Sequence, residues 1–124
     1  MNNDRFDRGA GVLDTLMGFR PTAEQTTDDF ARVTIEHLFG DVWSRPGLAL
    51  RDRSLITVAA LTVLGREQEL KMHLRGALRV GISRDEIREL LLHLAHYGGW
   101  PVAVGGLRVA AEIFADADEV TDAG

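Results

Sequence analysis

The stretch from Leu50 to Leu64 constrains the fold more than any other part of this chain. Its apolar residues fall on almost every side of a helix: Leu55, Ile56, Val58, Ala59, Ala60, Leu61, Val63 and Leu64. A helix with that composition is covered by other elements on all sides. We therefore predict a central helix, and Gly65 is placed to end it in the left-handed conformation that closes many helices.

A second helix is predicted from Arg66 to Val80, with Gly81 closing it in the same way. Its buried stripe is expected to contain Leu70, Leu74, Ala77 and Leu78. His73 borders this stripe, and Glu69, one helical turn earlier, lies within hydrogen-bonding reach of its ring. The two helices form a hairpin, and His73 is its most chemically promising side chain.

The segment before this hairpin is also predicted to be helical. Residues 6–17 have an apolar edge but contain glycines that weaken an isolated helix, so we expect them to pack on another element. A helix capped by Thr26 or Thr27 follows, and Gly40 is expected to interrupt it. The residues predicted on its inner faces are Phe30, Ala31, Val33, Ile35, His37 and Leu38. Residues 41–47, with Pro46, are predicted to form a turn-rich connection.

The clearest local signal follows the hairpin. Ser83 and Glu86 have the spacing of a capping box, which predicts a helix that continues to about Tyr97. Gly98 and Gly99 break the chain, and Pro101 suits the first position of a last helix, predicted over 102–114. The acidic tail, residues 116–124, is expected to fray.

These patterns predict an all-α fold of about six helices in a single domain, residues 1–124, with no strand. Two helices that are apolar all round are difficult to bury in so small a monomer, so we predict a homo-oligomer. The net charge of −5 argues against a nucleic-acid partner. The chain has neither a secretory leader nor an apolar run long enough to span a membrane, so we expect no membrane association and a cytoplasmic location.

Several kinds of site are excluded or disfavoured by composition. The chain has no cysteine, which excludes disulfides, thiolate metal sites and cysteine nucleophiles. His93 and His96 have a spacing that permits metal binding, but no carboxylate motif accompanies them, and we predict no metal site.

Several blocks of sequence resemble the carboxymuconolactone decarboxylase family. They are residues 6–9, 40–48, 50–57, 73–78, 81–87 and 91–101. Their order along nearly the whole chain is more specific than any single motif. The resemblance implies the helical fold shared with alkyl hydroperoxidase D, assembled as trimers or as hexamers.

The same resemblance separates two chemistries. Peroxidase-type members carry a glutamate and then a Cys-x-x-Cys-x-x-x-His motif across this hairpin. Counted back from His73, the cysteine positions hold Glu69 and Arg66, and the glutamate position holds Ser54. A cysteine-dependent peroxidase is therefore excluded, because no residue of this chain forms a thiolate.

The decarboxylase branch implies a small-molecule substrate, 4-carboxymuconolactone or a related unsaturated lactone acid from aromatic catabolism. Such a substrate accepts the electron pair of the departing carboxylate into its own lactone, so we predict no cofactor. The protein holds the carboxylates, stabilises the lactone oxygen and delivers a proton. The loop between Met17 and Thr27 is shorter than expected of the dedicated decarboxylase, which favours a paralogue with a different small substrate.

We assign the acid or hydrogen-bond donor to His73, oriented by Glu69; the alternative is that His73 only ties the hairpin together. His96, with Tyr97 and Trp100 nearby, is a second candidate, and its alternative role is to cap a helix end. Arg51, Arg53 and Arg75 are candidates to bind carboxylate, or else they pair with neighbouring acids.

Three further side chains have mainly structural interpretations. His37 is expected to be a satisfied core histidine, Glu36 an exposed glutamate, and Trp43 an anchor for its loop. A non-catalytic protein that binds a small ligand on the same scaffold is the alternative to an enzyme.

Overall fold

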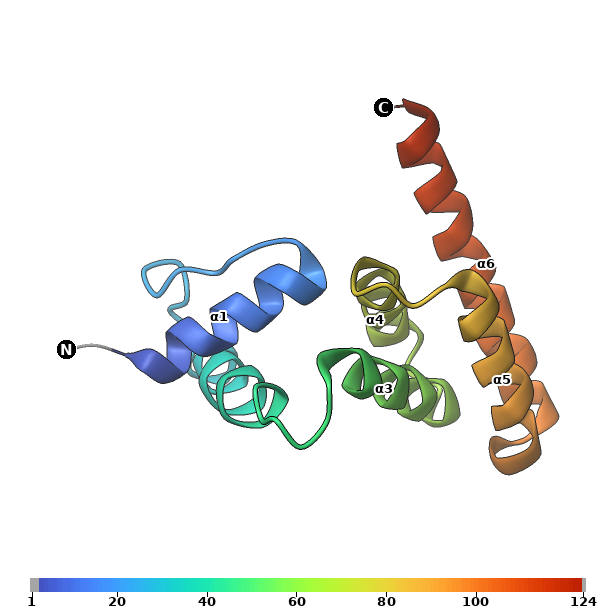
Figure 1. Ribbon diagram of the computed structural model, residues 1–124, viewed down its shortest axis with the longest axis horizontal. Coiled ribbons are helices and arrows are strands. Elements are labelled where there is room, and N and C mark those ends of the chain that lie inside the picture. The colour runs from blue at the N-terminus through green and yellow to red at the C-terminus, as the bar shows by residue number, and fades with distance from the viewer. Residues whose placement is uncertain (1–2, 124) are drawn as a thin grey trace. The chain divides into compact units, whose positions relative to one another are not determined.

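A computed structural model describes residues 3–123, and their side chains as far as Glu119. Among these residues there are six α-helices, one π-helix and no strand (Figure 1), which confirms the predicted all-α class. Within this range every helix is too short or too polar to cross a membrane. The chain packs as two compact units, Met1–Arg53 and Ser54–Gly124, and the assignment of a single domain remains a prediction.

The first unit begins with α1 (Asp4–Met17), which is amphipathic as predicted. The Asn3 side chain caps its N-terminus by accepting a hydrogen bond from the Phe6 N–H, and Gly18, at a φ of 83°, ends it. The buried residues of α1 are Phe6, Gly9, Ala10, Leu13 and Leu16. They face the π-helix of the same unit, so α1 packs on another element as expected.

The helix after the first loop starts later than predicted. Asp28 is the N-cap of α2 (Asp29–Val33), because its carboxylate accepts hydrogen bonds from the backbone N–H groups of Phe30 and Ala31. The prediction of Thr26 or Thr27 as the cap is wrong. The Thr26 hydroxyl is instead buried and donates to the Thr22 carbonyl at 2.8 Å.

Gly40 does not interrupt this helix, which continues directly into the π-helix η1 (Thr34–Trp43). The buried side chains of η1 are Ile35, Phe39 and Trp43, which are four residues apart and share one face of the helix. Ile35 was expected inside, but the other predicted inner faces are wrong. The structure leaves Phe30, Val33, His37 and Leu38 exposed and Ala31 partly exposed.

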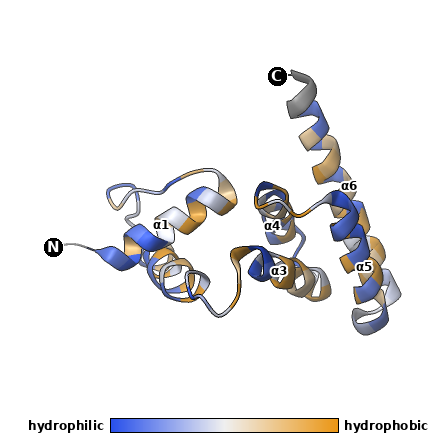
Figure 2. Ribbon diagram, in the orientation of Figure 1, coloured by the Kyte–Doolittle hydropathy of each residue, from blue (hydrophilic) through white to orange (hydrophobic). Residues whose placement is uncertain are grey.

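In the second unit the hairpin is present, but its first helix is not covered all round. The helix α3 (Leu50–Leu64) starts in the first unit and buries only Ser54, Val58 and Thr62. Apolar residues continue around it beyond its charged first turn (Figure 2), and Ile56 and Leu64 are 55% and 70% exposed. The prediction of a fully covered central helix is therefore wrong for the single chain. Gly65, at a φ of 71°, ends α3 as predicted.

The rest of the second unit follows the sequence closely. Its helices are α4 (Glu67–Arg79), α5 (Arg84–Gly98) and α6 (Trp100–Ala123). Ser83 and Glu86 form the predicted capping box, and Gly81, at a φ of 93°, follows α4. The core is formed by Val58, Leu70, Leu74, Ala77, Ile82, Ile87, Leu91, Val109, Ala110, Ile113 and Phe114. The predicted end of the last helix at Phe114 is wrong, because α6 remains helical to Ala123.

Candidate functional site

His73 lies on α4 between two buried leucines, Leu70 and Leu74. Its ring is half-buried, and its Nδ1 atom is shielded from solvent. Burial lowers the pKa of His73 below its ordinary value of 6.5, because the imidazolium loses hydration. At neutral pH this side chain is therefore a neutral imidazole, which has one N–H to donate and one nitrogen to accept.

Glu69 is ionised and is held by a neighbouring cation. Its carboxylate accepts a hydrogen bond from Arg66 at 3.0 Å. A hydrogen bond from its own backbone N–H, followed by the contact with Arg66, lowers the pKa of Glu69. The orientation of His73 by Glu69 remains a prediction, since the contact that positions the Glu69 carboxylate here is the one with Arg66.

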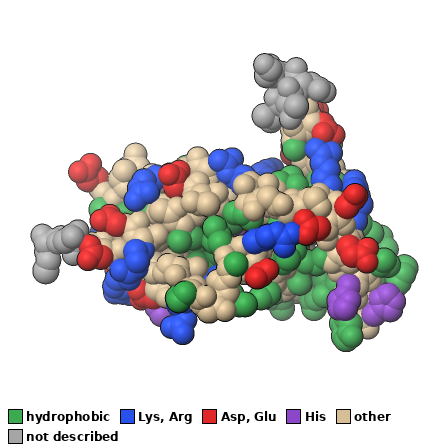
Figure 3. All heavy atoms as spheres, in the orientation of Figure 1, with side chains coloured by type: hydrophobic (Ala, Val, Ile, Leu, Met, Phe, Trp, Pro, Cys, Tyr) green, Lys and Arg blue, Asp and Glu red, His purple; other side chains and the backbone are tan. Residues whose placement is uncertain are grey.

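The second candidate group lies at the exposed end of α5. The Nδ1 atom of His96 is 3.0 Å from the carbonyl oxygen of Leu92, and its ring meets the edge of Trp100 at 6.0 Å between centroids. His93 stacks on Tyr97 at 5.1 Å. Figure 3 shows histidine and apolar side chains gathered at this end of the helix. The bond to a carbonyl in the last turn fits a helix-capping histidine, and a catalytic role for His96 remains a prediction.

The three candidate arginines lie in different places. Arg75 is two residues after His73, so it projects from nearly the opposite side of α4, and it pairs with Asp116 at 3.6 Å. Arg53 donates to the backbone carbonyl of Arg45 at 3.2 Å. Arg51 is half-buried in the first turn of α3. Arg51 and Arg53 belong to the first unit, and Arg75 belongs to the second unit, as His73 does.

A cavity of about 220 Å³ lies where the turn after α3 meets α6. Arg66, Glu67 and Arg108 contribute its charged groups, and Leu70 connects it to the buried stripe beside His73. Arg108 pairs with Glu67 at 3.3 Å. Sequence analysis assigned none of these charged residues to a site. Gly105 and Gly106 also line the cavity, but a Cβ atom on Gly106 would lie 2.8 Å from the side chains of Thr62 and Leu91, so this glycine allows close packing and gave no signal of a cavity.

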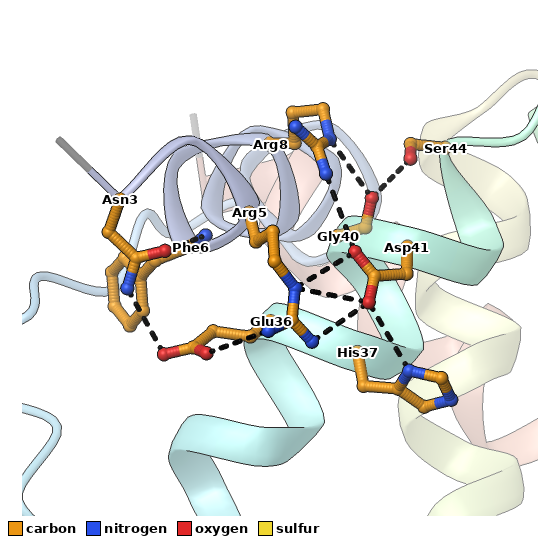
Figure 4. A network of polar contacts seen from close by, with 9 residues as sticks. All are labelled: Asn3, Arg5, Phe6, Arg8, Glu36, His37, Gly40, Asp41 and Ser44. Atoms are coloured by element: carbon orange, nitrogen blue, oxygen red, sulfur yellow. Dashed lines mark hydrogen bonds and ion pairs between the residues drawn. The ribbon is translucent and has the colours of Figure 1, made fainter.

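A polar network joins α1 to η1 in the first unit (Figure 4). Arg5 forms an ion pair with Asp41 at 2.8 Å, and its guanidinium holds the pKa of that carboxyl below the ordinary range. His37 is exposed, and its Nδ1 lies 3.3 Å from Asp41, so its predicted core position is wrong. Glu36 accepts from Asn3 at 3.1 Å and is more buried than the exposed glutamate predicted. This network holds two helices together.

The family is decided by comparison with known proteins. The model of the carboxymuconolactone decarboxylase family matches residues 28–112, which extend from the cap of α2 into α6 and include His73. The chain belongs to the carboxymuconolactone decarboxylase family. Its all-helical structure is consistent with the fold that this resemblance implied.

Two curated relatives in this family are decarboxylases. The chain is 39% identical to 4-carboxymuconolactone decarboxylase of Acinetobacter baylyi over 123 residues, which cover 94% of this chain and 92% of the relative. It is 33% identical to nitrosuccinic acid decarboxylase npaB of Metarhizium robertsii over 117 residues, 90% of this chain and 82% of the relative. An uncharacterized 15.0 kDa protein of Paracoccus denitrificans is 36% identical over 87 residues, 68% of this chain and 65% of that protein.

Within the family, this chain has a histidine but no cysteine on the hairpin. At the two positions where a peroxidase-type member carries its cysteines, this chain has Arg66, the N-cap of α4, and Glu69, in the first turn of α4. The Arg66 guanidinium donates a hydrogen bond to the Glu69 carboxylate. Ser54, at the position of the peroxidase glutamate, is fully buried. An acid–base or hydrogen-bonding role for His73 is compatible with this arrangement, whereas thiol chemistry is not.

Proposed function

We propose that this protein is a cofactor-free decarboxylase that acts on 4-carboxymuconolactone or a related small unsaturated lactone acid. The observation that carries the proposal is its 39% identity to a 4-carboxymuconolactone decarboxylase over nearly the whole of both chains. The half-buried His73 supplies a group suited to the chemistry.

The two substrates named for the relatives share a chemical feature that supports this reaction class. Each is an acid whose departing carboxylate lies next to an electron-accepting group, an unsaturated lactone in one and a nitro group in the other. When the carbon–carbon bond to the carboxylate breaks, carbon dioxide leaves and the electron pair moves onto that group. A proton then adds to carbon, and no external oxidant or reductant is needed.

His73 is proposed to donate a hydrogen bond to the lactone oxygen as negative charge develops there. A neutral imidazole suits this task, because burial disfavours the imidazolium and leaves one N–H as the donor. Glu69 is proposed to orient the ring, and Arg51, Arg53 or Arg75 is proposed to hold the substrate carboxylates. His96, Tyr97 and Trp100 are weaker candidates, since each makes a local contact that explains its position.

The protein is further proposed to act as a homo-oligomer, a trimer or a hexamer. Its exposed apolar side chains include Ile56, Val63, Leu64, Leu92, Val104 and Leu107 from three helices of the second unit. So much exposed apolar surface on so small a chain supports association with further copies.

Turnover is tested with purified protein and 4-carboxymuconolactone generated in place from its muconate precursor. We expect carbon dioxide release by the wild type and its loss in His73→Ala, with helical content unchanged by circular dichroism. His37→Ala is the matched control, because His37 is an exposed histidine of the first unit, and it should retain turnover. Absence of release at high enzyme concentration would overturn the proposal, and a ligand that raises the Tm without being converted would favour a binding protein instead.

A further inference from the structure

A groove of about 440 Å³ lies in the first unit, where η1 ends. One wall comes from α1 and includes Arg8, Val12 and Thr15. The other comes from the end of η1 and the turn after it, and includes Trp43, Arg45 and Leu48. His73 and the cavity beside α6 belong to the second unit, whereas every residue that lines this groove belongs to the first.

The charge lining the groove is positive. Two arginines contribute to its lining, and no aspartate or glutamate does, although the chain as a whole carries a net charge of −5. The Arg8 guanidinium forms an ion pair with Asp41 at 3.4 Å, and it also donates a hydrogen bond to the Gly40 carbonyl at 3.2 Å. The guanidinium of Arg45, by contrast, has no hydrogen bond or ion pair to any of the residues that the structure describes.

The backbone of Arg45 is nevertheless held on both sides. Its N–H donates to the Val42 carbonyl at 3.1 Å, and its own carbonyl accepts from Arg53 at 3.2 Å. The turn therefore fixes the backbone from which the Arg45 side chain extends, so that binding a ligand costs the freedom of the side chain but not of the main chain.

The other polar groups of the groove do not compete for the role of donor. The hydroxyl of Thr15 donates to the Gly11 carbonyl at 3.2 Å, and the hydroxyl of Ser44 donates to the Gly40 carbonyl. The rest of the lining is mainly apolar and includes the indole of Trp43, which is only 8% exposed and lies against Phe39. This combination suits an anion with a flat apolar body.

We infer that this groove binds a small flat carboxylate, with Arg45 pairing with the carboxylate group and Trp43 contacting the apolar body. Arg8 provides a second positive charge for the same ligand. A planar guanidinium matches a carboxylate with two parallel hydrogen bonds. The inference does not depend on the proposed function, because such an anion can bind here whether or not the protein decarboxylates it.

The test uses benzene-1,3-dicarboxylate as the probe and the uncharged benzene-1,3-dicarboxamide as its control. Each is titrated into the full ¹⁵N-labelled chain, and the indole N–H of Trp43, assigned with Trp43→Phe, reports on the groove. We expect saturable shifts at Trp43 and at the backbone N–H groups of Arg45, Gly47 and Leu48 with the dicarboxylate, and none with the diamide. Arg45→Gln should raise the Kd at least about tenfold, because the loss of a hydrogen bond between charged groups weakens binding by about that factor.

Arg79→Gln is the matched control, because Arg79 is also an exposed arginine without an ion-pair partner among the described residues and lies in the second unit. It removes the same charge and should leave the Kd unchanged. The inference would be overturned if no saturable shift occurred, if shifts were confined to the cavity near Arg66 and Arg108, or if the two substitutions weakened binding equally. The last result would indicate general attraction of the anion to positive charge.

Discussion

His73 combines a position beside an apolar stripe with a depressed pKa. Desolvation is the cause of that shift, so the packing that buries the ring also determines its protonation state. A histidine that stays neutral at pH 7 donates a hydrogen bond without carrying charge, and it accepts a proton only at lower pH. This property separates a hydrogen-bond donor from a general acid, which must be protonated before it acts.

The pKa of His73 leads to a prediction for both activity and stability. A proton NMR titration should give a midpoint below 6.5, and kcat/KM should rise through that midpoint and then level off as pH increases. The unfolded chain binds the proton more readily, so the free energy of unfolding contributed by His73 is present above pH 6.5 and is lost as pH falls through the folded pKa. His73→Gln should flatten that dependence. A midpoint above 6.5, or activity that falls with rising pH in this range, would contradict the proposed role.

The contact between α1 and η1 depends on two glycines: Gly9 of α1 lies against η1, and Gly40 of η1 lies against α1. A Cβ atom on Gly9 would lie 1.9 Å from the Ile35 carbonyl oxygen, and one on Gly40 would lie 2.3 Å from the Arg5 carbonyl oxygen. Both obstacles are backbone atoms, which cannot rotate away. These glycines therefore weaken helix propensity but allow the close approach on which the first unit is built.

Gly9→Ala should therefore destabilise the protein by about 1–3 kcal/mol or more, because the new methyl group forces α1 away from η1. Gly11→Ala is the control on the same helix. Its Cβ would meet only the Arg20 guanidinium at 3.6 Å, and replacing a helical glycine with alanine should stabilise by about 0.5–1 kcal/mol. Urea denaturation followed by circular dichroism measures both. Equal and small effects at the two positions would show that the helices do not approach as described.

At the scale of the whole molecule, the main feature is apolar surface without a covering element. On α3 the buried side chains are Ser54, Val58 and Thr62, and Leu55 and Leu61 are only partly buried against the core. Ile56, Val63 and Leu64 of the same helix are exposed. Phe30, on α2, is 81% exposed. Large apolar side chains grouped on helices in this way are typical of surfaces that associate.

Association through α3 is tested by Ile56→Glu, which places a charge on an exposed apolar face. We expect a smaller assembly than the wild type in analytical ultracentrifugation, because burying that carboxylate in an interface costs several kcal/mol. Gln68→Glu adds the same charge at an exposed polar position of α4 and should leave the assembly unchanged. A wild-type protein that sediments as a monomer would overturn the proposed oligomer.

Local signals in the sequence predicted much of the second unit. Gly65 and Gly81 end helices because the left-handed conformation is available to glycine at little cost, and Ser83 with Glu86 satisfies the N–H groups at the start of α5. The amphipathic spacing on α4 also placed His73 correctly at the border of the buried stripe. Each of these features depends on residues within one or two turns of one another, and such contacts can be read from the order of residues alone.

What only the tertiary structure decided depends on contacts between distant residues. The face of η1 that packs on α1 buries Ile35, Phe39 and Trp43 and leaves His37 exposed. The groove with Arg8 and Arg45 exists because the close contact at Gly9 and Gly40 brings α1 beside the end of η1. The sequence by itself determined the helices, the family and the position of His73, since these follow from local spacing and overall similarity. Which faces are buried, and which charged groups share a groove, depends on packing between helices that are far apart in the chain.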